Sequence, residues 1–440
     1  MTLEPIVQMR CLLAICAVWI TATLLAGGET LPILGWGGIP SDRATEGRYL
    51  EAKDAGFTHL SQWCDSPEDA KRLLGMAERT GMKLMLLAGS RMYSNPAGFA
   101  QVAKDSSALA FYFVHDEPHI KTLPKIADCI RRIEAVDPIH PCYVNLFGVL
   151  RRQKHYTGCE THEEYLRAVF AMLPLRFVSF DLYPVLCEGA RLPEGDFRMP
   201  SGRRAYLKPQ WYETLELTSA FAREKGLPMY AFALSTALSN HISNDNPVAT
   251  CAHLKLQQYS NLAYGAQMLQ YYTYRTTSRK SSCKCNNGPL LSDERRSPVF
   301  ERVREVNREL QARAYVFAGG RVKGVWHTGT TIPNATKRLG AGDLPPFVKS
   351  LETPDGGAVV SWIANGAYDY LVVVNRSPND EMTLNAQFAE GVEYVRKDGS
   401  RVPVAAYSSS FWPGPGDAEI FAKPTGVMFC DERHEKGEMK

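Results

Sequence analysis

The stretch AFYFVHDEPH, residues 110–119, combines the pattern of a buried strand with a pair of acids at its end. Apolar and aromatic residues lead into Asp116 and Glu117, and Pro118 follows directly. Proline cannot take part in strand hydrogen bonding through its nitrogen, so it marks the strand end. If alternation continues to that end, His115 and Glu117 lie on one face and Asp116 on the other. The stretch alone fits either a salt-bridged strand terminus or an acid delivered to a site.

Further strand-like and helix-like segments alternate on both sides of this stretch. Strand-like runs occupy residues 31–40, 57–63, 83–89, 142–148, 176–185, 227–236 and 266–274. Helical patterns occupy residues 49–56, 66–81, 123–138, 163–173, 212–226, 255–265 and 300–317. Eight strands with helices over about 250 residues are typical of a (β/α)8 TIM barrel. A doubly wound open sheet fits the first units, but no Gly-rich phosphate turn follows the first strand. The sequence therefore predicts a closed barrel.

The pattern changes after residue 318. Short alternating runs cover residues 356–365, 369–377, 381–388, 391–404 and 418–424, separated by Gly, Pro and Asp turns. Within one of them, Asp398-Gly399 between strand residues is a hairpin signal. We expect an α/β chain with a barrel over residues 29–318, a small all-β sandwich over 319–430 and a charged tail over 431–440.

The N-terminus is the part of the chain that resembles a targeting segment. Arg10 precedes the apolar run CLLAICAVWITATLLAGG, and polar Glu29 follows it. We interpret residues 1–28 as a signal peptide, with a retained membrane anchor as the alternative. This predicts a secreted or periplasmic protein of a bacterial cell envelope, with no stable membrane association after signal removal.

The overall composition excludes one class of partner. The 440-residue chain is 45% hydrophobic and 22% charged, as soluble globular proteins are, and its net charge is +3. Such a balance carries no electrostatic footprint for nucleic acid. We expect no nucleic-acid partner, and the sequence makes no prediction of oligomeric state.

Cysteine and histidine spacing gives little support for a metal or other cofactor. An odd, scattered set of cysteines remains outside the leader, which argues against a disulfide framework. Cys283 and Cys285 form a close pair, but no second close pair completes a zinc spacing. A site built from His115, Asp116 and His119 is an alternative without the HxH or HExxH spacing of known metal motifs. We expect neither metal nor cofactor.

Polar residues gather where the predicted barrel strands end, which is where barrel enzymes build their sites. Aromatic rings stack on the apolar faces of sugars, while amides and acids bind hydroxyl groups. This mixture predicts a carbohydrate ligand. The residues expected to bind it are Trp36, Trp63, His115, Asp116, Asn145, Tyr183, Tyr272 and Tyr274.

Glycoside hydrolysis ordinarily uses two carboxyl groups, one protonated as acid and one ionised as nucleophile or base. Glu117 is the predicted general acid, because a glutamate inside a barrel end with an acid beside it has its pKa raised. Asp181 is the predicted partner, with Asp245, Glu188 and Asp65 as weaker candidates. An ordinary loop-ordering role for Asp181 is the alternative.

Several motifs resemble those of the clan A glycoside hydrolases, in particular the family 42 β-galactosidase-like barrels of gut bacteria. They are residues 35–40, the segment YLEAKDAGFTHL at 49–60, and the acid pair with its proline at 116–118. DYLVVVNRS at 369–377 and FWPGPGDAEIF at 411–421 resemble the β-sandwich that often follows such barrels. The resemblance implies the same two-domain fold.

The resemblance also implies roles and shows departures. The family's Asn-Glu-Pro, whose glutamate is the acid/base, corresponds to Asp116, Glu117 and Pro118 here. Aspartate replaces asparagine, so the usual donor to the sugar 2-hydroxyl is missing. The family's nucleophile is a glutamate at the end of strand seven, but LPMYAFALST at 227–236 contains no carboxylate. The open possibilities are another acid such as Asp181, an inverting or substrate-assisted mechanism, or a barrel that binds sugar without cleaving it.

Overall fold

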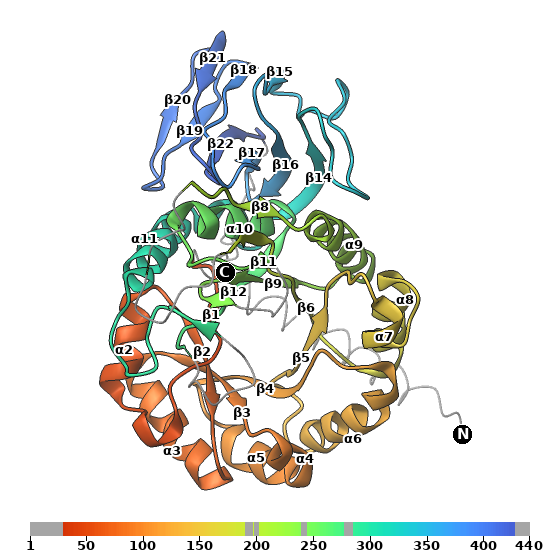
Figure 1. Cartoon of the computed structure of the whole chain (residues 1–440), viewed down its shortest axis with the longest axis vertical. Coiled ribbons are helices and arrows are strands. Elements are labelled where there is room, and N and C mark those ends of the chain that lie inside the picture. The colour runs from red at the N-terminus through yellow and green to blue at the C-terminus, as the bar shows by residue number, and fades with distance from the viewer. Residues whose placement is uncertain (1–29, 190–196, 198–201, 239–243, 277–284, 427–440) are drawn as a thin grey trace, which may run out of the picture.

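The computed structural model describes residues 30–189, 197, 202–238, 244–276 and 285–426, without the side chains of residues 244 and 245. Eight strands form a closed barrel in the order β1-β12-β9-β6-β5-β4-β3-β2 (Figure 1). All eight pairings are parallel, which confirms the predicted TIM barrel. The strands are β1 Ile33–Gly35, β2 His59–Trp63, β3 Lys83–Leu87, β4 Leu109–Asp116, β5 Cys142–Phe147, β6 Val178–Asp181, β9 Met229–Leu234 and β12 Ala266–Tyr272. The predicted signal peptide (1–28) and charged tail (431–440) lie outside the described residues.

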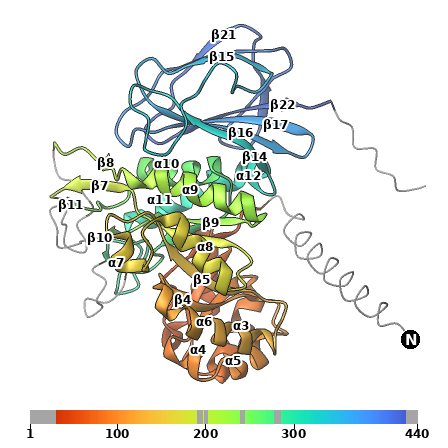
Figure 2. The same cartoon turned by 90° about the vertical axis from the view of Figure 1, so that its right-hand side faces the viewer.

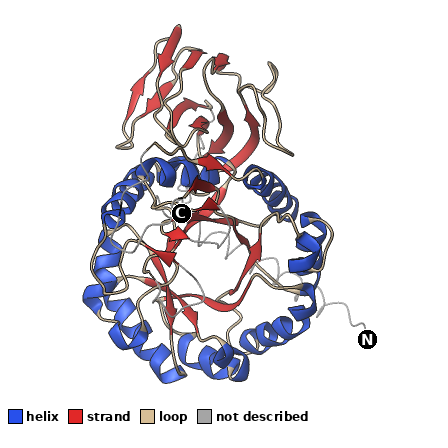
Figure 3. Ribbon diagram, in the orientation of Figure 1, coloured by secondary structure: helices blue, strands red, loops and turns tan. Residues whose placement is uncertain are grey.

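Helices surround the barrel on its outside (Figure 3). Local signals set their ends: the Ser66 hydroxyl accepts from the Asp69 amide at the start of one, and Gly81 ends it in a left-handed conformation. The sequence missed two helices between β3 and β4. The helices are α2 Glu46–Asp54, α3 Pro67–Thr80, α4 Ser90–Ser94, α5 Pro96–Ala103, α6 Leu123–Glu134, α7 Gln153–Thr157, α8 His162–Met172, α9 Gln210–Lys225, α10 Cys251–Ala263, α11 Pro298–Ala312 and α12 Ala314–Phe317, with the 3-10 turns η1 Ser41–Arg43 and η2 Ile120–Thr122.

The barrel interior is a packed core with a polar layer above it. Inward-facing side chains fill the barrel, as expected for eight tilted strands. They are Leu34, Met85, Leu87, Phe111, Tyr143, Phe177, Tyr230 and Met268. Above them the hydroxyl of Tyr143 donates to Gln270 Oε1 at 2.5 Å, and Gln270 Nε2 donates to Ser179 Oγ at 3.1 Å. Polar side chains thus begin one layer below the carboxyl ends of the strands, an end we call the mouth.

Short strands extend the loops that follow β6, β9 and β12. Figure 2 shows them together beside the barrel. They form one three-stranded sheet and one two-stranded sheet. Their bounds are β7 Val185–Glu188, β8 Tyr206–Leu207, β10 Ala237–Leu238, β11 Asn244–Asp245 and β13 Cys285–Asn286.

The C-terminal domain consists of two antiparallel sheets over their own apolar core, as predicted. The predicted Asp398-Gly399 hairpin joins β19 and β20. One sheet contains β14 Arg321–His327, β16 Ala358–Asn365, β17 Tyr368–Asn375, β22 Ala418–Pro424, β19 Glu393–Val395 and β20 Arg401–Pro403. The other contains β15 Val348–Glu352, β18 Leu384–Phe388 and β21 Ser408–Phe411.

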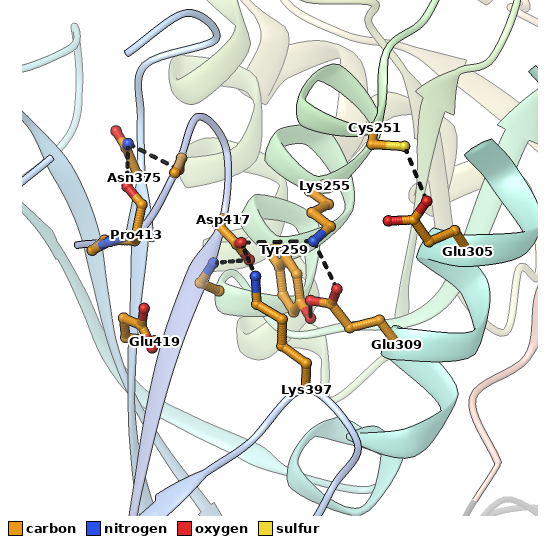
Figure 4. Close-up of polar contacts among 12 residues, drawn as sticks. Cys251, Lys255, Tyr259, Glu305, Glu309, Asn375, Lys397, Pro413, Asp417 and Glu419 are labelled. Atoms are coloured by element: carbon orange, nitrogen blue, oxygen red, sulfur yellow. Dashed lines mark hydrogen bonds and ion pairs between the residues drawn. The ribbon is translucent and has the colours of Figure 1, made fainter. Parts of the chain in front are cut away.

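An ion-pair cluster joins the two domains (Figure 4). The Lys255 ammonium of α10 lies 2.7 Å from Glu309 Oε2 of α11 and 3.6 Å from Asp417 Oδ2, next to β22. Lys397, from the β19–β20 hairpin, also pairs with Asp417. Lys255 and both its partners are about nine-tenths buried.

Two further observations concern the cysteines and the helices of the described residues. Cys64, Cys129, Cys142, Cys159, Cys187 and Cys251 are free thiols. In the part of the chain that the structure describes, no helix has the length and apolar character needed to cross a membrane.

Candidate active site

Strand β4 does not keep its alternation to the end. Its pairing with β5 slips between Phe113 and His115, so the side chains beyond the slip change faces. Asp116 therefore points toward the barrel axis, where Asn145 Nδ2 donates to its Oδ1 at 3.1 Å. His115 turns to α4 instead, with its Nδ1 2.8 Å from the Tyr93 hydroxyl. The predicted faces of His115 and Asp116 are therefore wrong, because uniform alternation ignores such an irregularity.

Glu117 adopts a backbone conformation that few non-glycine residues use. Its φ is 48°, in the left-handed region, and its N–H donates to the Asn145 carbonyl at 2.9 Å. Residues held in this region cost of order 1–3 kcal/mol and cluster at functional sites. Here the turn brings the Glu117 carboxyl against the carboxyl of Asp181 at the end of β6, to which it donates a hydrogen bond.

Asp181 is held by three donors. Asn145 Nδ2 donates to its Oδ1 at 3.1 Å, and the Tyr183 hydroxyl and the Glu117 carboxyl also donate to it. Since Ser179 Oγ donates to Asn145 Oδ1 at 2.9 Å, the Asn145 amide is oriented with its NH2 toward the acids. The polar side chains beneath therefore hold in place Asp116, Glu117 and Asp181, which we call the acid cluster.

Burial raises the pKa values of the three acids in the cluster, and mutual repulsion raises those of Glu117 and Asp116 further. Burial raises the pKa of Glu117, and the charges of Asp181 and Asp116 raise it further. Asp116 reaches solvent, yet protein encloses it on most sides. This desolvation and the charge of Asp181 raise the pKa of Asp116, and the hydrogen bond from Asn145 partly offsets the increase. Burial also raises the pKa of Asp181, against its three hydrogen bonds. The pKa of Glu117 is raised furthest, to about 10, whereas that of Asp116 is raised to about 7. Glu117 is consequently the acid that keeps its proton above neutral pH.

Asp116 and Asp181 share one donor, the side-chain amide of Asn145. Its Nδ2 lies 3.1 Å from Oδ1 of each aspartate. The two aspartates therefore lie together at the mouth.

Aromatic side chains lie around the acids. Tyr183 and Tyr272 are stacked, with ring centroids 5.5 Å apart and planes at 27°. Trp36 packs edge-on against Phe113 at 5.1 Å between centroids. Trp63, at the end of β2, is 48% exposed. The structure thus brings Trp36, Tyr183 and Tyr272 to the mouth as expected and leaves Trp63 at its rim.

Tyr274 requires a correction. It was expected to line the mouth, but it is fully buried and packs against Phe57 at 5.2 Å between centroids. β12 ends at Tyr272, and beyond it the Tyr274 amide bonds the carbonyl of Trp36 at 2.7 Å. The side chain therefore points into the core, where no substrate can reach it.

The remaining candidate acids do not join the cluster. Asp65 pairs with Arg91 at 3.2 Å on the exposed rim, and Glu188 pairs with Arg203 at 3.1 Å. The side chain of Asp245 lies outside the described part of the structure. At the end of β9, the Ser235 hydroxyl donates to the Thr273 carbonyl at 3.0 Å.

The alternative metal site does not assemble. His115 bonds Tyr93, and Nδ1 of His119 accepts from the Lys121 amide at 3.1 Å. Among the described residues, no group of three or more His, Cys, Asp or Glu side chains is arranged to hold a metal ion.

Sequence analysis did not identify two residues of the site, Lys208 and Gln270. Lys208 follows β8, with its amide donating to the Pro184 carbonyl at 2.9 Å. Burial lowers the pKa of its ammonium, and the nearby charge of Asp181 opposes that effect. No local signal could have found Lys208, because a long loop brings it back. Gln270 was detectable, since it shares a strand face with Tyr272 and interrupts an apolar run.

A TIM barrel followed by a β-sandwich is also the fold of several glycoside hydrolases of solved structure. A family 42 β-galactosidase from G. stearothermophilus matches with a TM-score of 0.59 at 9% identity, over 90% of this chain and 99% of that one. A β-galactosidase from Bacillus circulans sp. alkalophilus gives 0.57 at 9% identity over the same shares. A family 5 glycoside hydrolase from Bacteroides vulgatus gives 0.53 at 10% identity, over 89% of each chain.

Comparison by sequence finds no match: neither a protein-family model nor a curated protein matches the chain. At identities of 9–10% the structural likeness establishes the fold. The activity has to be argued from the residues of the site.

Proposed function

We propose that the protein is a glycoside hydrolase in which Glu117 is the general acid and a carbohydrate is the substrate. The observation that carries the proposal is the position of Glu117 at the barrel mouth, in a left-handed turn where burial and the charges of Asp181 and Asp116 raise its pKa. A general acid must hold its proton at working pH until the leaving oxygen takes it. Neighbouring Trp36, Tyr183 and Tyr272 supply the flat apolar surfaces that sugar rings stack on.

Replacement of Glu117 by glutamine tests the role. Glutamine keeps the size of the side chain but has no acidic proton, so Glu117→Gln should lower kcat/KM on oligosaccharides by about 10²–10⁴-fold. The loss should be much smaller on aryl glycosides whose leaving groups need no protonation, such as dinitrophenyl glycosides. Comparing both substrate types in steady-state assays measures this difference.

A matched control separates the acid from a general charge effect. Asp65→Asn removes a carboxylate that is 74% exposed at the rim and pairs only with Arg91 among the described residues. Its kcat/KM should stay within about twofold of the wild type, because surface pairs contribute little. Near-normal turnover of oligosaccharides by Glu117→Gln would contradict the proposal.

A barrel that binds carbohydrate without cleaving it is the second candidate. It is favoured by the end of β9, because residues 227–236 include no carboxylate that could act as the nucleophile. Binding of oligosaccharides to the wild-type protein in calorimetry, with no product after prolonged incubation, would favour this binding function over hydrolysis.

Export is a further part of the proposal and rests on sequence alone. The apolar run after Arg10 supports a signal peptide that directs the protein to the periplasm or the medium of a bacterial cell. Edman sequencing of protein recovered from cell fractions should place the mature N-terminus near residue 29. Recovery of residues 1–28 in a membrane fraction would indicate an anchor instead.

A further inference from the structure

We infer that the substrate is a 2-acetamido-2-deoxy-glycoside whose own acetamido oxygen acts as the nucleophile. The inference rests on the proposed function and specifies its substrate class. Its starting point is that two adjacent residues, Asp116 and Glu117, present opposite hydrogen-bonding characters at one place.

Glu117 is the donor of the pair. Its carboxyl keeps a proton and donates it to Asp181 in the unliganded site. The glycosidic oxygen of a bound sugar can replace Asp181 as the acceptor, since that oxygen must receive a proton for the bond to break.

Asp116 is the acceptor of the pair. Its side chain reaches solvent, and among the described residues only Asn145 bonds it, at Oδ1. In a 2-acetamido sugar the N–H is attached to C2, next to the carbon that bears the glycosidic oxygen. The donor Glu117 and the acceptor Asp116 are adjacent in the chain. The groups they would bind, the glycosidic oxygen and the N–H, are on adjacent carbons of the sugar.

The position of the nucleophile follows from the other strand ends. Asp181 and Asp116 accept from the same Asn145 amide at 3.1 Å each, so Asp181 lies on the same side of the site as Asp116. At the end of β9, Ser235 uses its hydroxyl on the Thr273 carbonyl and its N–H on the Tyr272 carbonyl, at 3.0 and 2.8 Å. That strand end is tied into backbone hydrogen bonds and offers no carboxylate. A nucleophile carried by the substrate completes the reaction without one.

The reaction balances with these groups. The acetamido oxygen bonds to C1 as the C1–O bond to the leaving group breaks, and Glu117 gives its proton to the leaving oxygen. Asp116 stabilises the positive charge that develops on the N–H of the resulting five-membered ring. Water then attacks C1 while the Glu117 carboxylate takes a proton from it, and the ring opens to regenerate the acetamido group. Because the acetamido oxygen attacks from the face opposite the leaving group, the substrate is 1,2-trans, a β-glycoside in the gluco and galacto series.

Matched aryl glycosides test the substrate class on the full-length protein. 4-Nitrophenyl 2-acetamido-2-deoxy-β-D-glucoside and -galactoside should be hydrolysed, whereas their 2-hydroxyl counterparts should not. With mono-, di- and trifluoroacetamido substrates, kcat/KM should fall with each added fluorine, because fluorine withdraws electrons from the attacking oxygen. The thiazoline analogue of the ring intermediate should inhibit the wild type competitively.

Asp116→Asn tests the acceptor. Asparagine retains the shape but loses the charge, so kcat on the acetamido substrate should fall by about 10²–10³-fold with a small change in KM. Asp65→Asn is again the control, and the thermal midpoints of both variants should match the wild type.

The outcomes separate the inference from the proposed function. Hydrolysis of 2-hydroxyl glycosides that is lost in Glu117→Gln, with no fluorine dependence on acetamido substrates, would overturn the inference and leave the glycosidase intact. No hydrolysis of either series and no thiazoline binding would overturn both. A wild-type turnover in Asp116→Asn would overturn the role of Asp116.

Discussion

Among the single residues of the site, Glu117 has its pKa raised by its surroundings. Burial is the largest cause of the raised pKa of Glu117, and the charge of Asp181 is the next. Asp181 can remain an acceptor because Asn145 and Tyr183 also donate to it. The residue that sequence analysis assigned as a second catalytic acid is thus placed to set the protonation of the first.

The pH dependence of Asp181→Asn tests this arrangement. Glu117 acts in its protonated form, so activity is lost as pH rises through its pKa. Removing the charge of Asp181 lowers that pKa, and the alkaline limb of the kcat/KM profile should move to lower pH. An alkaline limb at the wild-type position would contradict the coupling. Asp65→Asn should leave the limb unmoved.

At the scale of elements, close backbone packing at the strand ends positions the site. The loop after β1 carries Trp36 and crosses β2 at Gly38, whose amide donates to Ser61 Oγ at 3.3 Å. A Cβ at Gly38 would lie 1.9 Å from the Ser61 carbonyl oxygen, closer than any side chain tolerates. Only glycine allows this loop to lie against β2.

Gly38→Ala should therefore destabilise the protein. Overpacking against backbone costs about 1–3 kcal/mol or more, because neither partner can move aside without breaking strand pairing. Urea unfolding followed by circular dichroism measures the change. Gly47→Ala in α2 is the control: its Cβ meets only Thr45 Oγ1 at 3.8 Å, and the substitution should stabilise by about 0.5–1 kcal/mol. Equal stability of the two variants would contradict the close approach.

At the scale of the whole molecule, buried charges tie the barrel to the sandwich. The Arg313 side chain, between α11 and α12, is fully buried. It donates to the Tyr259 hydroxyl at 2.9 Å and to the carbonyls of Val395, Arg396 and Ala418, each 3.1–3.2 Å away in the C-terminal domain. Together with the Lys255 cluster of Figure 4, these bonds make the sandwich an integral support of α10 and α11.

Arg313→Met should lower the free energy of unfolding by about 3–5 kcal/mol, because it leaves buried carbonyl acceptors without their donor and removes one of the two cations beside Glu309. Chemical denaturation gives the change, and an early separate transition of the sandwich would show that the domains had become uncoupled. Arg131→Met is the matched control. Arg131 and its partner Asp128 are 74% and 52% exposed, so their loss should stay within about 1 kcal/mol. Wild-type stability of Arg313→Met would contradict the structural role.

The architecture and the strands that carry the acids could be predicted from the order of residues alone. Apolar strands alternating with helices, the Ser66 cap and the Asp398-Gly399 turn are local signals, and local interactions are enough to produce them. Strand order in the chain also placed Glu117, Asp181, Asn145 and Tyr183 at one end of the barrel, because parallel strands share that end.

How these side chains contact one another could not be predicted in this way. The slip of β4 against β5, the left-handed turn at Glu117 and the contact with Asp181 depend on pairing and packing between distant segments. A long loop brings Lys208 to the site, and Tyr274 points into the core two residues beyond the end of β12. A periodic pattern specifies which residues form a strand, but a single irregularity in register changes which of them face the site.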